Sequence, residues 1–198
     1  AAVQQTGAAI GRGAASDVPG LLCGPSGSGK SRYARLLHEN SRRAVHAFIK
    51  IDCTTLNDER FESELLGRLN TVGNSRTGGL SASSGGTLYF DEVTALSMGM
   101  QRRLLTLLET GFVREAGSER SVAVGWRVVC ATSALNPAAL VSAGQLRADL
   151  WLRLCVARIR VPALAERIED IEELAQLILK RLPRAERIAL KLSPEGLM

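Results

Sequence analysis

The chain has 198 residues, a formal net charge of +5 and 45% hydrophobic residues, which is enough for one globular domain with a full core. No apolar stretch in the sequence is long enough to span a membrane and no signal-peptide pattern opens it, so we expect a cytoplasmic protein without a membrane partner. Only 4% of the residues are aromatic and they do not interleave with the basic ones, which argues against a groove for single-stranded nucleic acid.

Apolar patterns typical of strands and of helices alternate along the chain. Strands are expected at 20–24, 46–52, 87–91, 126–132 and 155–161. Helices are expected at 30–39, 58–67, 99–110, 136–142, 146–153 and 167–182. Residues 68–86, which are rich in Gly, Ser, Thr and Asn, and the short charged stretch 115–121 are expected to be loops. This alternation predicts an α/β fold with a parallel sheet covered by helices on both faces.

The cysteines and histidines show no metal-ligand or redox spacing. All four cysteines lie in or beside apolar, strand-like runs and are expected to be buried reduced thiols: Cys23, Cys53, Cys130 and Cys155. His38 and His46 are isolated in the sequence, so we expect surface or structural roles for them.

The strongest motif lies between the first strand and the first helix and reads Gly24-Pro25-Ser26-Gly27-Ser28-Gly29-Lys30-Ser31. It matches the phosphate-binding loop pattern G-x-x-x-x-G-K-[ST], so all eight residues are predicted to contact a nucleotide. The glycines let the backbone turn its N–H groups toward an anion. We expect Lys30 to contact the outer phosphates and Ser31 to ligate Mg²⁺. The alternative, a glycine-rich surface turn that happens to hold a lysine, conflicts with the flanking strand and helix.

Polar residues at the ends of two later strands complete a candidate site. Asp91 and Glu92 end the apolar run 87–91, where Asp91 would hold Mg²⁺ through its water shell and Glu92 would activate the attacking water. Ser133 follows the strand at 126–132, where a polar group could sense the γ-phosphate of ATP. A strand that simply ends in a hydroxyl fits the spacing of Ser133 nearly as well.

Two arginines near the predicted helix 146–153 allow two interpretations. Arg147 and Arg153 are six residues apart and do not share a helix face. They are either solvated, with Asp149 as a salt-bridge partner, or they deliver charge to a phosphate across a subunit boundary.

With these motifs, nearly the whole chain resembles the central AAA+ ATPase domain of the sigma-54-dependent transcription activators, the bacterial enhancer-binding proteins. Beside the loop 24–31, the resemblance is carried by Arg35-Leu36-Leu37-His38, Glu62-Ser63-Glu64-Leu65-Leu66-Gly67, Gly85-Gly86-Thr87-Leu88-Tyr89-Phe90-Asp91-Glu92, Gln101-Arg102-Arg103-Leu104-Leu105, Arg147-Ala148-Asp149-Leu150, Val161-Pro162-Ala163-Leu164, Glu166-Arg167 and Glu169-Asp170-Ile171. It implies a P-loop NTPase three-layer sandwich with a five-stranded parallel sheet.

The resemblance also implies roles for the site residues. Lys30 and Ser31 would bind ATP and Mg²⁺, and Asp91 and Glu92 would form the Walker B pair. Arg147 and Arg153 match the family's two arginine fingers, which reach a neighbour's nucleotide in a ring that is expected to be a hexamer. An arginine finger can contribute ~10³–10⁵ in the rate of phosphoryl transfer.

The resemblance divides the chain into an AAA+ core at 1–192 and the start of a truncated helical lid at 193–198, where Ser193-Pro194-Glu195 is a helix-start signal. Because the chain opens without methionine and this helix is not continued, we expect one domain excised from a longer protein. The family places a regulatory domain before this domain and a DNA-binding helix-turn-helix after it.

One departure from the family concerns its partner. Active members carry a Gly-Ala-Phe-Thr-Gly-Ala loop whose aromatic tip engages sigma-54. Residues 68–84 replace that loop here with a shorter, polar segment that contains no phenylalanine. Small polar residues offer little apolar area to a partner. We therefore expect no remodelling of sigma-54 polymerase.

Other departures concern the catalytic residues. Asp52 stands where the family usually has an asparagine that restrains the Walker B glutamate, and a carboxylate there would repel Glu92 or share its proton. Ser133 stands where the family has an asparagine with more reach. Ser31 replaces a family glutamate and restores the ordinary P-loop ligand. We expect the chain to retain nucleotide binding, which should be weak without the lid. We expect ATP hydrolysis to be slow or differently controlled.

The leading hypothesis is an ATP-binding regulatory domain of a bacterial transcription factor, in which nucleotide-dependent self-assembly controls DNA-bound activity, with RNA polymerase holoenzyme carrying the housekeeping sigma factor as a candidate partner. One alternative is an ATPase-driven sigma-54 activator with an atypical contact loop. Two others are a non-transcriptional AAA+ remodelling ATPase and a small P-loop kinase. The paired arginines and the Asp-Glu pair at a strand end argue against the kinase. A sensor that binds a cyclic dinucleotide through Arg12, Arg32 and Arg35 is a further alternative, based on resemblance alone.

Overall fold

The computed structural model describes residues 10–11, 13–59, 61, 65, 85–114, 121–123, 125–134 and 136–181. Residues 68–84 of the expected loop 68–86 lie outside the described residues, as do the expected lid start at 193–198 and most of the expected helix at 58–67.

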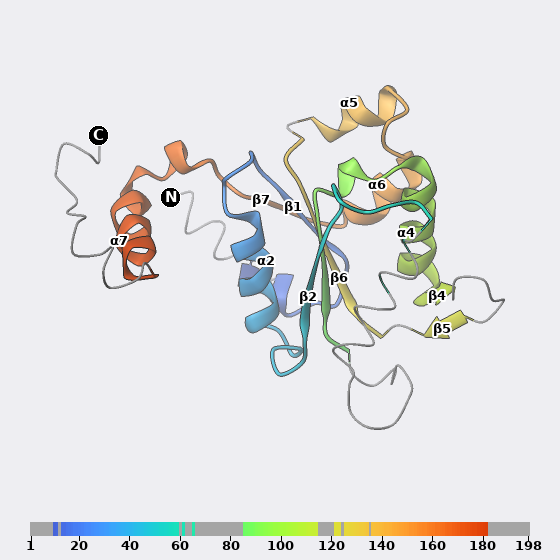
Figure 1. The fold of residues 1–198 in the computed structure, drawn as a ribbon, viewed down its shortest axis with the longest axis horizontal. Helices are drawn as coiled ribbons and strands as arrows, with labels where there is room; N and C mark the ends of the chain where they lie inside the picture. The colour runs from blue at the N-terminus through green and yellow to red at the C-terminus, as the bar shows by residue number, and fades with distance from the viewer. Residues whose placement is uncertain are drawn as a thin grey trace.

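Five parallel strands form one sheet in the order β2-β3-β6-β1-β7 (Figure 1). Their bounds are Gly20–Cys23 for β1, Phe48–Asp52 for β2, Thr87–Asp91 for β3, Arg127–Thr132 for β6 and Ala157–Arg160 for β7. All five predicted strands are present: β3 has the predicted bounds, and the other four are one to three residues shorter than predicted because their end residues do not pair. The predicted five-stranded parallel sheet is confirmed.

Helices cover both faces of this sheet and complete three layers (Figure 1). On one face lies α2 (Lys30–Glu39) and on the other lie α4 (Met98–Thr110) and α6 (Ala148–Leu154). Further helical elements are the 3₁₀ turns η1 (Val93–Ala95), η2 (Leu164–Glu166) and η3 (Ile168–Asp170), with α5 (Pro137–Ser142) and α7 (Ile171–Arg181). The helix predicted at 167–182 therefore begins only at Ile171, after a 3₁₀ turn.

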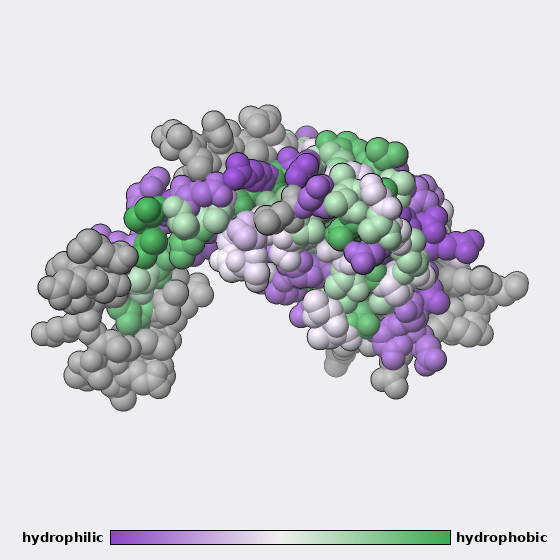
Figure 2. All heavy atoms as spheres, turned by 90° about the horizontal axis from the view of Figure 1, so that it is seen from above, coloured by the Kyte–Doolittle hydropathy of each residue, from purple (hydrophilic) through white to green (hydrophobic). Residues whose placement is uncertain are grey.

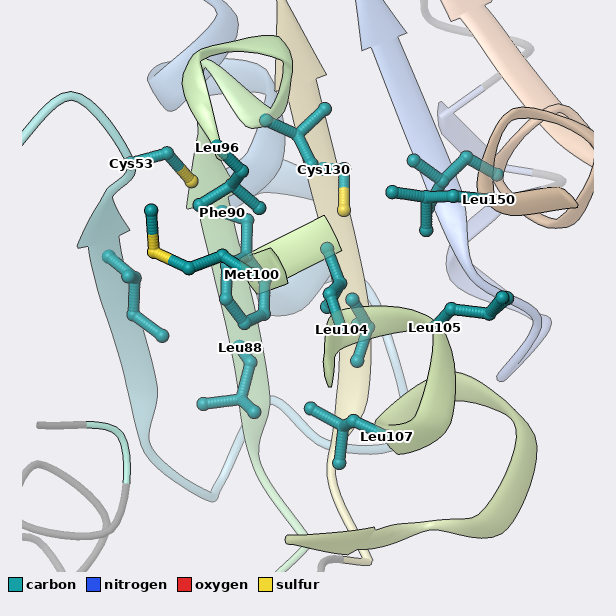
Figure 3. Close-up of a cluster of buried hydrophobic side chains, with 14 of the residues drawn as sticks. Cys53, Leu88, Phe90, Leu96, Met100, Leu104, Leu105, Leu107, Cys130 and Leu150 are labelled. Carbon is teal, nitrogen blue, oxygen red and sulfur yellow. The ribbon is translucent and has the colours of Figure 1, made fainter. Parts of the chain in front are cut away.

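The central strands are apolar on both faces because each face packs under a helical layer. Along β3, Leu88 and Phe90 enter the cluster beneath α4 and α6, whereas Tyr89 enters the cluster beneath α2. Figure 3 shows the first cluster, in which Met100 and Leu104 of α4 face Phe90. Residues that alternate in direction along one strand thus join two separate cores.

The structure buries three of the four cysteines, as predicted, and gives His38 a structural role. Cys23, Cys53 and Cys130 are buried free thiols and Cys155 is half-buried. Burial raises the pKa of each of the four thiols, which keeps them protonated. His38 is buried and its Nδ1 lies 2.9 Å from the hydroxyl of Thr87, which is a structural role.

A small antiparallel hairpin follows α4 and was not predicted. It pairs β4 (Phe112–Arg114) with β5 (Ser121–Ala123), so Ser121 belongs to a strand and not to the expected connector 115–121. Strands of three residues are too short to give a readable alternation in the sequence. Among the helices that the structure describes, none has the length and apolar character that crossing a membrane requires.

A buried glutamine joins α4 to the segment that leads into α6. Gln101 is fully buried, and its Nε2 donates to the carbonyls of Leu96 and Gln145, each at 2.9 Å. Its Oε1 accepts from the backbone N–H of Arg147 at 2.9 Å. One amide therefore satisfies three backbone groups and fixes the start of α6.

We predict that Gln101→Leu lowers stability by about 3 kcal/mol because it leaves these backbone groups without partners in a buried place. For a domain of this size the melting temperature should fall by roughly 6–12 °C, measured by circular dichroism. The control is Arg102→Leu at the exposed neighbouring position of α4. Equal melting temperatures for the two variants would contradict the assignment.

Candidate nucleotide site

The loop 24–31 joins β1 to α2, as predicted, and two of its glycines are required by the geometry. A Cβ on Gly24 would overlap the carbonyl oxygen of Val161 and lie 3.0 Å from Ser28 Oγ. Gly29 precedes α2 with φ 85° and ψ 23°, a left-handed conformation that favours glycine. The loop therefore wraps tightly against Val161, directly after β7, and leads into the N-terminus of α2.

The pairing of the strands brings the predicted polar residues to one edge of the sheet. Cys23 of β1 lies opposite Thr132 of β6, and Phe90 of β3 lies opposite Cys130 of β6. The loop after β1, the acids at the end of β3 and Ser133 after β6 are therefore neighbours.

A cavity of about 370 Å³ opens at this edge and is lined by Ser26, Gly27, Gly29, Lys30, Ser31, Asp52, Thr54, Asp91 and Glu92. Figure 2 shows the molecule from this side: hydrophilic and near-neutral atoms occupy the middle of the face, and hydrophobic atoms gather toward the right, where Figure 1 places α4, α5 and α6. The lining is polar and carries both signs of charge, as a site for a phosphate chain and a cation requires.

Lys30 connects the phosphate-binding loop to the acid after β3. Its side chain is 6% exposed, and its Nζ donates to the carbonyls of Gly24 at 3.0 Å and Pro25 at 3.2 Å. The same ammonium forms an ion pair with Oε1 of Glu92 at 3.1 Å. The two predicted halves of the site are thus in direct contact.

Glu92 adopts a backbone conformation that is unusual for its residue type, with φ 56° and ψ 55°. Residues held in this region are strained and cluster at functional sites. Its Oε2 accepts from both the backbone N–H and the hydroxyl of Ser133, each at 2.8 Å. Ser133, which we expected to reach less far than an asparagine, therefore holds Glu92 directly. Asp52 instead accepts from the N–H and hydroxyl of Thr54, at 3.0 and 2.6 Å.

Ser31 and Asp91, the predicted Mg²⁺ ligands, are hydrogen-bonded to each other. Ser31 Oγ lies 3.1 Å from Asp91 Oδ2, and Tyr89 donates its hydroxyl to Asp91 Oδ1 at 2.8 Å. Burial opposes ionisation of Asp91, but hydrogen bonds from Lys50 and Tyr89 outweigh it and lower the pKa of this carboxyl. A hydroxyl and an ionised carboxylate are ligands that suit Mg²⁺, so the residues fit the ion.

No cluster of three or more His, Cys, Asp or Glu side chains with metal-binding geometry occurs within the described ranges. At nucleotides, Mg²⁺ is commonly bound by one or two protein ligands together with phosphate oxygens. The arrangement can bind a phosphate chain, hold a hydrated cation and present a carboxylate to a water molecule.

Two further basic residues contact residues of the site or of its loop, and the sequence did not reveal their roles. Lys50 of β2 lies 2.6 Å from Asp91 Oδ2. Arg167 is 7% exposed, and its Nη2 donates to the carbonyl of Ser28 at 2.6 Å while its Nη1 reaches the hydroxyl of Tyr33 at 3.3 Å. Lys50 could have been noticed as a charged residue between two isoleucines of a predicted strand. The only sequence signal for Arg167 was that Glu166-Arg167 resembles a segment of the family.

Arg147 and Arg153 do not line the cavity. Arg147 precedes α6 and binds Asp149 through two hydrogen bonds of 3.0 and 2.7 Å, which raise the pKa of the guanidinium. Arg153, in the last turn of α6, donates to the carbonyl of Leu108 at 3.5 Å. Within one chain, Arg147 therefore has the salt-bridge partner that the sequence suggested.

Two of the three arginines considered for a cyclic dinucleotide lie on α2. Arg12 lies outside the described residues, Arg32 is exposed on α2, and the Arg35 guanidinium lies 4.8 Å from the ring centre of Phe48. Binding of a cyclic dinucleotide by this chain is a hypothesis based on resemblance alone.

Comparison with known proteins agrees with this geometry. The family model described as the sigma-54 interaction domain matches residues 1–160. The response regulator protein PilR of Pseudomonas aeruginosa is 44% identical over 177 residues, which cover 87% of this chain and 40% of PilR. The HTH-type transcriptional regulatory protein TyrR of Haemophilus influenzae is 41% identical over 174 residues, which cover 87% of this chain and 54% of TyrR.

Among solved structures, NtrX from Brucella abortus in complex with ATP superposes with a TM-score of 0.80 at 32% identity, covering 99% of this chain and 45% of NtrX. The chain thus spans about half the length, or less, of these relatives. Since the family model covers most of the chain and the fold is that of a P-loop NTPase, the chain belongs to the sigma-54 interaction domain family, the AAA+ domain of bacterial transcription regulators.

Proposed function

We propose that this chain is the ATP-binding regulatory module of a bacterial transcription regulator. It binds ATP with Mg²⁺, assembles with copies of itself in a nucleotide-dependent way, and so controls activity on DNA through a domain outside this chain. The observation that carries the proposal is the meeting of Lys30, Ser31, Asp91 and Glu92 in one polar cavity.

Nucleotide binding is supported by the chemistry of the cavity. The phosphate-binding loop and the N-terminus of α2 supply backbone N–H groups, and Lys30 supplies a positive charge. Ser31 and Asp91 suit Mg²⁺, which when bound would offset charge on the phosphates. A related protein, NtrX, is known in complex with ATP. In this chain, Lys30 would exchange its contact with Glu92 for a phosphate oxygen.

Self-assembly is supported by the surface of α6. Arg153 is exposed in the last turn of α6, next to Leu152 in the sequence, and Val156 follows the helix; the exposed fractions of Leu152 and Val156 are 70% and 65%. Large apolar side chains beside a cation form a surface that a second copy can cover. Because Arg147 and Arg153 do not line the cavity of their own chain, we propose that they act on the nucleotide of a neighbour in a ring, with a hexamer as the expected form.

Contact with sigma-54 is not part of the leading proposal. Residues 68–84 lack the phenylalanine of the family's contact loop. The family membership favours one second candidate, an ATPase-driven sigma-54 activator that uses residues 68–84 as an atypical contact loop.

We predict that Lys30→Ala weakens binding of Mg·ATP by about 10- to 100-fold, which is the contribution of a charge-assisted hydrogen bond to a phosphate. Isothermal titration calorimetry on the full chain measures this change. The control is Arg102→Ala, which removes an exposed cation on α4. A Lys30→Ala variant that binds as well as the wild type would remove the basis of the proposed site.

We predict opposite effects on ATP turnover for the two residues that form the Ser133–Glu92 hydrogen bond. Glu92→Gln should lower turnover by about 100-fold or more, because the amide cannot accept a proton from water. Ser133→Ala should raise it by about two- to tenfold, because it releases Glu92 from one donor. Phosphate release at saturating ATP measures both rates.

Thr94→Ala is the matched control for Ser133→Ala, since it removes a nearby hydroxyl that contacts Thr132 at 3.0 Å and not Glu92. If Ser133→Ala lowered turnover as Glu92→Gln does, Ser133 would act on the phosphate instead.

We predict that the protein does not open a promoter complex with sigma-54 RNA polymerase, because residues 68–84 offer little apolar surface. Open-complex formation on a sigma-54 promoter measures this, with an activator that carries the Gly-Ala-Phe-Thr-Gly-Ala loop as positive control. The matched variant carries that loop in place of residues 68–84. Robust activation by the unmodified protein would favour the second candidate.

A further inference from the structure

Lys50 places a positive charge at the point where the two predicted Mg²⁺ ligands meet. Its Nζ lies 2.6 Å from Asp91 Oδ2 and 3.1 Å from Ser31 Oγ. These are the same two oxygens that lie 3.1 Å from each other. The ammonium therefore contacts both groups that a divalent cation would use.

The fold directs Lys50 to this position. It lies on the edge strand β2 and pairs in register with Tyr89 of β3. Residues two apart share a strand face, so Lys50 lies on the same face as Phe48, which packs in the cluster beneath α2. Ser31 lies in the first turn of α2, directly across that face.

Tyr89 completes the cluster around Asp91. Its hydroxyl donates to Asp91 Oδ1 at 2.8 Å, and the Lys50 ammonium lies 5.9 Å from the centre of its ring. One carboxylate oxygen thus takes a phenol hydrogen bond and the other an ion pair. Both oxygens of Asp91 are occupied by groups of this chain.

Lys50 contributes a positive charge to a site where negative charges predominate once a nucleotide is bound. The cavity contains the carboxylates of Asp52, Asp91 and Glu92, and a triphosphate would add further negative charge. In most nucleotide sites a divalent cation offsets such charge. Lys50 supplies part of the same offset from the protein, and its 48% exposed side chain can move to a phosphate oxygen with little desolvation.

We propose that Lys50 is an internal cation that competes with Mg²⁺ for Ser31 and Asp91, so that this chain binds nucleotide with only a weak dependence on divalent metal. The inference rests on the proposed nucleotide site and adds a property to it. Lys50 acts here as a positioning residue, because it holds Ser31 and Asp91 together and sets how strongly binding responds to Mg²⁺.

The test is a comparison of ATP affinity in EDTA and in saturating Mg²⁺ for the full chain and two variants. For the wild type we expect the two affinities to agree within about threefold. Lys50→Met should raise their ratio by about tenfold, the contribution of one charge-assisted hydrogen bond, through weaker binding in EDTA. Lys50→Arg should retain the wild-type ratio, and Arg102→Met controls for loss of one positive charge elsewhere.

A second measurement uses Mg²⁺ without nucleotide. If Lys50 competes with the metal, added Mg²⁺ should raise the melting temperature of Lys50→Met more than that of the wild type, because the variant leaves Ser31 and Asp91 to the metal. Equal shifts would contradict competition. The melting temperature and circular dichroism spectrum without metal show whether the variant is folded.

The outcomes separate this inference from the proposed function. If wild type and Lys50→Met both bind Mg·ATP and lose the same factor of affinity in EDTA, the role of Lys50 is wrong and the nucleotide site stands. If neither binds ATP in either condition, both proposals fail. If Lys50→Met does not fold, a strict Mg²⁺ requirement of the wild type overturns the inference.

Discussion

The parallel pairing of β1 and β3 on either side of β6 is the constraint on which the site depends. Each of these strands is buried on both faces, so its polar residues can lie only where the strand ends. Because all three run in one direction, their carboxyl ends share an edge. The phosphate-binding loop, the Asp91–Glu92 pair and Ser133 come together for this reason, although they are far apart in sequence.

At that edge the protein balances its own charges through specific contacts. Lys30 pairs with Glu92, and Lys50 pairs with Asp91. Glu92 keeps a left-handed backbone while Ser133 holds its other oxygen. A phosphate chain must therefore compete with contacts already made within the site. The affinity for nucleotide depends on the difference between these two sets of contacts, and not on the positive charge of the loop alone.

The features of the fold and site that could be predicted are those that a short stretch of sequence determines by itself. The loop 24–31 and the acids at 91 and 92 each follow an apolar strand directly, so their chemistry is local. The pairing partners of Lys50, Ser133 and Arg167 come from other strands and turns, and no local pattern encodes them. The hairpin of β4 and β5 was missed for a related reason, since three-residue strands are defined by their partner and not by their own periodicity.

Arg167 has a consequence for the segment that follows the sheet. Its guanidinium binds the carbonyl of Ser28 in the phosphate-binding loop, stacks near Tyr33 of α2 and lies 3.6 Å from Asp170, just before α7 begins. Arg167 thereby connects the phosphate-binding loop to the segment in which the backbone leaves the core. The helix α7, which begins one residue after Asp170, extends beyond α2 and away from the sheet (Figure 1). One buried side chain thus joins the phosphate-binding loop to the turn from which this helix starts.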